Sequence, residues 1–93
     1  MNNHKYKEGL IFEIKSLAGI DNRLYLRDDI ISKLYIGDKV KVIYSGCKNN
    51  KLEYELIALN NNGTEMIIDG KNLSSDFMSE DEIDIMMGDG NNV

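Results

Sequence analysis

The sequence is poor in the residues from which reactive and metal-binding sites are built. Its 93 residues include one cysteine, Cys47, one histidine, His4, and no proline or tryptophan. A single cysteine cannot form a disulfide within the chain, and a structural zinc site needs about four cysteine or histidine ligands. Catalysis by a Ser–His or Cys–His pair is disfavoured because the one histidine lies near the N-terminus. We expect no enzyme activity, no metal and no cofactor.

Long apolar runs are lacking as well. No stretch approaches the roughly 18 apolar residues that cross a bilayer, and residues 1–5 lack the apolar core of a secretory signal. The glycines are isolated and turn-like, so there is no phosphate-binding loop. These absences predict a cytoplasmic protein with no membrane partner. The abundance of Asn, Ile and Lys indicates an AT-rich bacterial or phage genome.

Charge is distributed unevenly along the chain. Residues 1–60 hold ten Lys or Arg and eight Asp or Glu, whereas residues 61–93 hold one Lys and eight Asp or Glu. The net charge of −5 is therefore concentrated in the C-terminal third. Blocks of one sign are typical of interaction tails. We accordingly expect a folded domain at 1–70 and an acidic tail at 71–93.

Apolar and polar residues alternate in several short segments, as in strands that bury one face. The alternation predicts strands in five ranges, 10–15, 23–27, 39–44, 52–58 and 64–69. Three aromatic residues lie on the core phase of this pattern, namely Phe12, Tyr44 and Tyr54. Three others lie off it, namely Tyr6, Tyr25 and Tyr35. The predicted fold is mainly β, a small five-stranded β-barrel of the SH3-like, OB-like or swapped-hairpin kind.

A first short helix is expected between the second and third strands, at about 28–35. Ile30, Ile31 and Leu34 share one helical face there, and Asp28 precedes them as a capping residue type.

A second, acidic helix is expected at about 79–87. Ser79 and Glu82 have the spacing of a capping box. About nine residues are too few for a helix to persist alone in water, so this helix must dock on something.

The tail is one candidate site, because apolar and acidic side chains interleave there as in segments that fold on a basic partner. The candidate partner-binding residues are Phe77, Met78, Glu80, Asp81, Glu82, Ile83, Asp84, Met86 and Met87. The alternative is a tail packed on its own domain. Both interpretations predict burial of Ile83 and Met86.

A basic strand face is the other candidate site. Arg and Tyr side chains that alternate on the outside of a strand suit contacts with phosphates and stacking on bases. The candidate nucleic-acid-binding residues are Arg23, Tyr25, Arg27, Lys39 and Lys41. An ordinary solvated sheet face has the same pattern.

The motifs from residue 9 to residue 42 follow a recurring order: two strands, a one-turn helix and a Gly-Asp-led third strand. The matching residues are 23–26, 29–30, 33–34, 36 and 37–42. In these residues the segment resembles the swapped-hairpin domain of AbrB and MazE-type regulators. The resemblance implies an interleaved homodimer that binds DNA and, in antitoxins, an acidic tail that wraps a toxin. The chain departs from the family at Arg27, where the family has proline.

Two non-catalytic functions stay open on the sequence. One is a DNA-binding, antitoxin-like regulator whose acidic tail engages a protein. The other is a phage-type inhibitor or adaptor that binds a basic host or defence protein by nucleic-acid mimicry, without binding DNA. Both predict a macromolecular partner, and neither excludes a homodimer.

Overall fold

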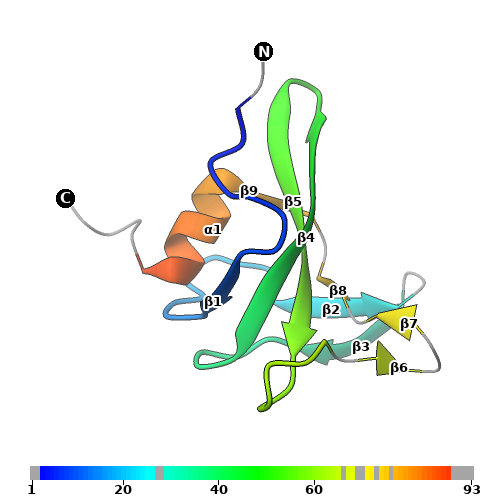
Figure 1. The fold of residues 1–93 in the computed structure, drawn as a ribbon. Helices are drawn as coiled ribbons and strands as arrows, with labels where there is room; N and C mark the ends of the chain where they lie inside the picture. The colour runs from blue at the N-terminus through cyan, green and yellow to red at the C-terminus, as the bar shows by residue number, and fades with distance from the viewer. Residues whose placement is uncertain are drawn as a thin grey trace.

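The computed structural model describes residues 3–26, 29–65, 67–68, 71–72, 74–75 and 77–88 (Figure 1). Strands make up most of the regular structure, as expected for a mainly β fold, and one short helix follows them. The elements are β1 (Ile11–Glu13), β2 (Arg23–Leu26), β3 (Asp29–Lys33), β4 (Lys39–Lys48), β5 (Lys51–Leu59), β6 (Ile67–Ile68), β7 (Lys71–Asn72), β8 (Ser74–Ser75), β9 (Met78–Ser79) and α1 (Glu80–Met87).

The main sheet is curled and open. Its order is β1-β4-β5-β8-β2-β3, β9 also pairs with β5, and β6 and β7 form a separate two-stranded sheet. A closed barrel needs its end strands to hydrogen-bond to each other, but in the described part of the chain β1 pairs only with β4 and β3 only with β2. The expected closed five-stranded barrel is therefore wrong. In the order of the sheet, β5 is followed by β8, β2 and β3, which have two to five residues. These strands are too short to complete the wall that β4 and β5 begin.

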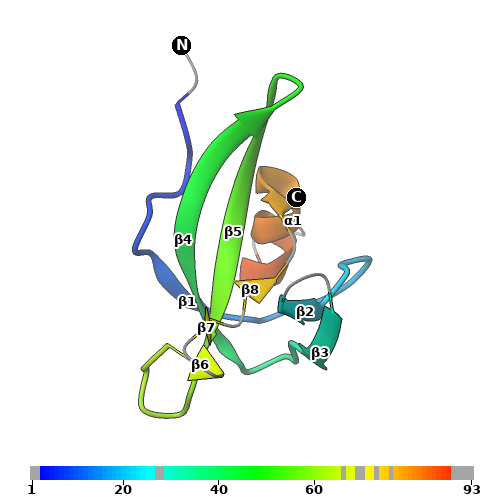
Figure 2. The same cartoon turned by 90° about the vertical axis from the view of Figure 1, so that its right-hand side faces the viewer.

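The hairpin of β4 and β5 is the longest element, and its tip projects beyond the rest of the sheet (Figures 1 and 2). The two strands have ten and nine residues. Asn49 and Asn50 form the tip with φ values of 53° and 66°, the left-handed backbone that a tight hairpin turn requires and asparagine tolerates. The alternation predicts shorter strands here because it does not extend into the polar residues near the tip.

A bulge between Val42 and Tyr44 changes which side chains of β4 face the core. Val40 and Val42 are buried, as the alternation predicts, but one extra residue reverses the phase beyond them. Tyr44 is consequently 48% exposed, so its expected core position is wrong. Tyr6 shows the opposite error: it is buried, with its ring 5.6 Å from that of Tyr54.

The helix expected at 28–35 is wrong, because residues 29–33 form strand β3. β3 pairs antiparallel with β2, and Ile30, opposite Tyr25, is 51% exposed. A five-residue segment with two β-branched isoleucines gains more from cross-strand pairing than from an isolated helical turn. Leu34 is buried as expected, and the cap expected at residue 28 lies outside the described residues. The one-turn helix that the family resemblance implies is thus a strand in this chain.

The strand expected at 64–69 is present only in part. Glu65 makes a single bridge to Leu59, and Ile67–Ile68 pairs with Lys71–Asn72 in the separate sheet instead of extending the main one. Residues 66 and 69 lie outside the described residues.

Helix α1 lies within the range expected at 79–87 and packs on the concave side of the sheet (Figure 2). Ser79 caps it through the reciprocal bonds of a capping box with Glu82, and Gly88 ends it with φ of 85°. Ile83 and Met86 are fully buried in the same core as the inward side chains of β1, β2, β4 and β5. The tail expected at 71–93 therefore contributes to the core. No helix in the described part of the chain is long and apolar enough to span a membrane.

Candidate functional site

Three of the apolar tail residues expected to bind a partner are core residues instead. Met78, Ile83 and Met86 are each 1% exposed or less. Met87 packs against the same core while partly exposed. A partner cannot reach Met78, Ile83 or Met86 while α1 is docked, so the alternative of a tail packed on its own domain describes this structure. Phe77, just before β9, is the exception because it is 47% exposed.

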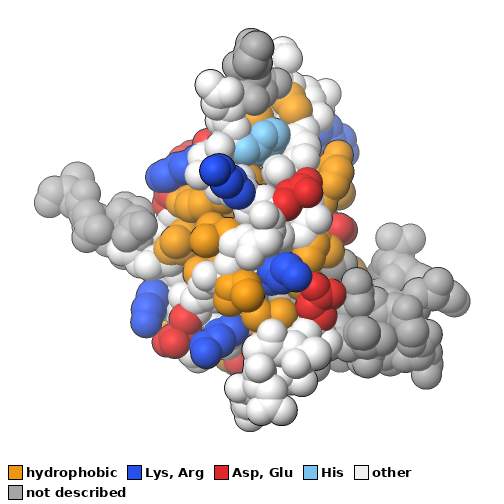
Figure 3. Space-filling model, viewed as in Figure 1, with side chains coloured by type: hydrophobic (Ala, Val, Ile, Leu, Met, Phe, Trp, Pro, Cys, Tyr) orange, Lys and Arg blue, Asp and Glu red, His pale blue; other side chains and the backbone are white. Residues whose placement is uncertain are grey.

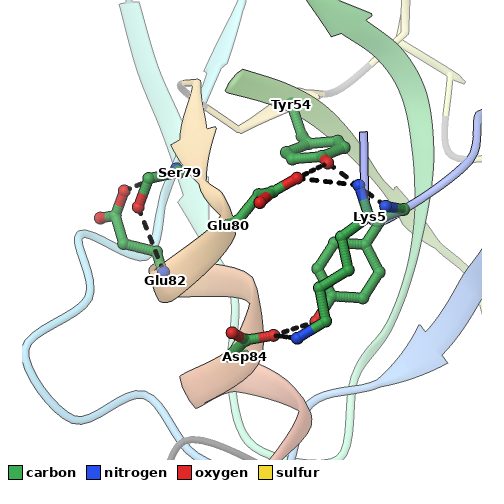
Figure 4. Close-up of polar contacts among 7 residues, drawn as sticks. Lys5, Tyr54, Ser79, Glu80, Glu82 and Asp84 are labelled. Atoms are coloured by element: carbon green, nitrogen blue, oxygen red, sulfur yellow. Dashed lines mark hydrogen bonds and ion pairs between the residues drawn. The ribbon is translucent and has the colours of Figure 1, made fainter. Parts of the chain in front are cut away.

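The acidic side chains of α1 are mostly engaged within the chain (Figure 4). Glu80 accepts hydrogen bonds from the Tyr54 hydroxyl at 2.5 Å and from the Lys5 backbone N–H at 2.8 Å. Asp84 accepts from the Lys5 ammonium at 2.8 Å and from the Tyr6 hydroxyl. We call these five residues the clasp, because they tie the N-terminal segment to α1.

The charged groups of the clasp are stabilised by their partners within the chain. The hydroxyl of Tyr54 lowers the pKa of Glu80, and Lys5 followed by Tyr6 lowers that of Asp84. Burial, with the Asp84 bond second, raises the pKa of Tyr6 to about 12. Both carboxylates are therefore held ionised by groups of their own chain. Glu82 is used in the capping box, which leaves Asp81 as the exposed acid of α1.

The described basic residues that were expected to contact nucleic acid, Arg23, Lys39 and Lys41, are not gathered into one patch. Arg23 is on β2, with β8 and β5 between it and Lys39 and Lys41 on β4. The Arg23 guanidinium lies 5.7 Å from the Tyr25 ring and makes two bonds to Asp21, at 2.7 and 2.5 Å.

Arg23 and Lys41 are both partly neutralised by acids. Arg23 lowers the pKa of Asp21 to about 2, and Lys41 pairs with Glu65 at 2.7 Å. Arg27 lies outside the described residues. The Lys and Arg side chains visible in Figure 3 are scattered among acidic and apolar ones.

Two exposed aromatic rings meet on the outer face of the sheet. The rings of Tyr44 and Phe77 lie edge to face with their centroids 6.1 Å apart. The Tyr44 ring also lies over Gly46, since a Cβ on Gly46 would be 2.6 Å from Tyr44 Cε2. Glycine at 46 thus lets the ring lie against the hairpin. We call Tyr44 and Phe77 the ring pair.

Glu55 lies beside the ring pair on the same face of β5. It pairs with Tyr44 across the hairpin, and because Tyr54 pairs with Met78, one step along the chain places Phe77 next to Glu55. Burial alone raises the pKa of the Glu55 carboxyl, and no Lys or Arg among the described residues forms an ion pair with it. This carboxylate therefore differs from those of the clasp.

The sequence interpretation missed Glu55 and placed Tyr44 in the core. Phe77 reaches Tyr44 only because β9 pairs with β5, which is a long-range contact. One local signal was present, since Gly46 follows Tyr44 at a spacing of two on a strand and leaves room for its ring.

Groups that could perform chemistry are scarce among the described residues. The His4 Nε2 atom is 2.7 Å from the Gly46 carbonyl oxygen, so this ring nitrogen is committed to the backbone. A hollow of about 370 Å³ near β3 and the end of β5 is lined by Lys33, Asp38 and neighbouring residues. The carboxylate of Asp38 accepts the Tyr35 N–H at 2.8 Å, as in a turn. Within the described ranges, no three His, Cys, Asp or Glu side chains converge to hold a metal ion.

Comparison with known proteins gives no relative for this chain. No family model, no curated protein and no solved structure matches it significantly.

Proposed function

We propose that this chain is a non-catalytic binding protein that docks a basic protein partner on the outer face of its β4–β5 hairpin. The ring pair is the observation that carries the proposal. Tyr44 and Phe77 are 48% and 47% exposed although each could bury a large apolar area. Aromatic side chains of this kind dominate the binding energy of protein interfaces.

The two carboxylates nearest the ring pair favour a basic partner, whereas Lys48 and Lys51 lie on the same face nearer the hairpin tip. Glu55 and Glu53 lie on the same face of β5, since each pairs across the hairpin with an outward residue of β4. Neither carboxylate has a cation partner among the described residues. The chain as a whole carries a net charge of −5, which steers positively charged partners toward it.

Binding to DNA is supported less well by the contacts. Arg23 would have to exchange its two bonds with Asp21 for bonds to a phosphate. Lys41 would likewise have to leave Glu65. A phosphate contact made at the expense of an existing ion pair contributes little net affinity. The antitoxin-like DNA-binding function stays a prediction from the sequence, and the inhibitor or adaptor function is the one we propose.

The test compares tagged variants in pull-downs from the native host, with and without nuclease. We expect a basic protein that the wild-type chain retains after nuclease treatment, and that Y44A/F77A retains at less than about a tenth of that level. The matched control is Y35A/I36A, which removes two side chains that are 61% and 65% exposed elsewhere on the surface.

Equal retention by Y44A/F77A and the wild type would refute the proposed docking face. Loss of all bound material on nuclease treatment would instead favour the DNA-binding function.

A further inference from the structure

We propose that Glu55 is the specificity-determining carboxylate of the docking face, and that it binds a guanidinium group of the partner beside the rings of Tyr44 and Phe77. This inference rests on the proposed function, because it names the chemical group that the docking face selects.

The strand register brings the three side chains together. Tyr44 and Glu55 are cross-strand partners on β4 and β5, and Phe77 stands one step before the Met78–Tyr54 pair on the other side of β5. The two rings approach each other over this strand, at 6.1 Å and an interplanar angle of 65°. Glu55 thus has an aromatic side chain on each side of it.

The state of Glu55 sets it apart from three partly buried carboxylates that have a cation partner. Asp21 is paired with Arg23, Glu65 with Lys41, and Asp84 with Lys5. Glu55 is half-buried, and the described residues offer it no cation. Burial of an unpaired charge is unfavourable, so it persists where function requires it. Its raised pKa has burial as its cause.

A guanidinium group matches this site in shape and charge. Its planar fork can donate two hydrogen bonds to one carboxylate, and its flat face is attracted to aromatic rings. An ammonium group has no such plane. The ring pair supplies the stacking surface and Glu55 the charge, so one arginine side chain satisfies both.

The direct test is an NMR titration of the full-length, isotope-labelled chain with N-acetyl-arginine amide. We expect saturable shifts of the Tyr44 and Phe77 ring signals and of the Glu55 carboxyl carbon. N-acetyl-citrulline amide, a neutral probe of the same shape, should leave these signals unchanged. We expect E55Q to raise the dissociation constant for the arginine probe by about tenfold or more. The control D81N, which removes an exposed charge on α1, should not change it.

The melting temperature of E55Q distinguishes a role of Glu55 in binding from a role in folding. Because burial disfavours the charged form of Glu55, E55Q should melt at the same temperature as the wild type or higher at neutral pH. A lower melting temperature, a citrulline response equal to that of arginine, or unchanged binding by E55Q would each overturn the inference. If E55Q retained the protein partner in the pull-down while Y44A/F77A lost it, the docking face would stand and the arginine site would fall. If both variants retained it, the proposed function would fall as well.

Discussion

Helix α1 and the outer face of β5 both carry acidic side chains, but the two regions use them differently. On α1, Glu80 and Asp84 accept hydrogen bonds from Lys5, Tyr6 and Tyr54, and Glu82 completes the capping box with Ser79. On β5, Glu55 has no partner among the described residues, and burial raises its pKa. The acids of the most acidic segment of a sequence can thus be used to hold the fold together.

The largest effect is expected from a change that tests whether α1 is part of the core. Replacing Ile83, which is fully buried, with alanine should lower the free energy of unfolding by about 2–5 kcal/mol, because the lost methyl groups leave a cavity. Urea unfolding followed by circular dichroism measures this change. D81A on the exposed side of α1 is the control and should change stability by less than about 0.5 kcal/mol. A loss as small in I83A would show that α1 does not dock as described.

Removal of the Tyr54 hydroxyl should have the next largest effect. Tyr54 donates to Glu80 and accepts the Tyr6 N–H at 3.2 Å, so Y54F leaves two polar groups without this partner. We expect Y54F to lower the free energy of unfolding by about 1–3 kcal/mol. Y35F is the matched control, since Tyr35 is 61% exposed, and it should unfold at the wild-type urea concentration. Equal stability of Y54F and Y35F would argue against the clasp.

The two regions should also respond to pH with opposite sign. Glu80 and Asp84 have pKa values below their ordinary 4.5 and 3.8, so they stabilise the fold above those values, and this stabilisation is lost as the pH falls through their lowered pKa. Glu55 has a raised pKa, so its contribution declines as the pH rises from 4.5 through the pKa of the folded state. Unfolding free energies of D84N and E55Q from pH 2 to 7 separate the two. D84N should be less stable than the wild type at neutral pH, and this difference in unfolding free energy should disappear toward acid pH. E55Q should show its gain in unfolding free energy over the wild type at neutral pH.

The smallest change in stability should come from Gly46. An added Cβ at 46 meets the outer atoms of the Tyr44 ring at 2.6 to 2.9 Å, and these belong to a side chain that can turn away. G46A should therefore cost less than about 1 kcal/mol and still move the Tyr44 ring from Phe77. The nuclear Overhauser contacts between the two rings measure this displacement. Intact contacts in G46A would show that glycine is not what lets the ring lie against the hairpin.

Several parts of this fold follow from local rules and could be predicted from the sequence. The alternation of Val40 and Val42 with lysines identified the buried phase of β4, because a sheet with one buried face imposes a period of two. Ser79 and Glu82 located the start of α1, because a capping box is satisfied within four residues. Burial of Ile83 and Met86 followed from the shortness of that helix.

The errors arise where long-range contacts decide. The bulge at Val42 and Tyr44 reverses the phase of β4, and the alternation of apolar and polar residues does not mark it. The segment 29–33 carries apolar residues compatible with a helix or a strand, and pairing with β2 decides between them. Glu55 became a candidate only when β9 brought Phe77 to it. The charge run at 80–84 does not reveal its bonds within the chain, because Lys5, Tyr6 and Tyr54 are distant in the sequence.

A site-resolved titration of the side-chain carboxyl carbons in the folded chain tests the central claim most directly. Glu55 should titrate above the ordinary glutamate value of 4.5, and addition of the arginine probe should lower its pKa. Glu80 should titrate below 4.5 and Asp84 below 3.8, and addition of the probe should leave both pKa values unchanged. If Glu55 titrated at or below 4.5, or if the probe shifted Glu80 and Asp84 instead, the assignment of α1 to folding and of the β5 face to binding would be contradicted.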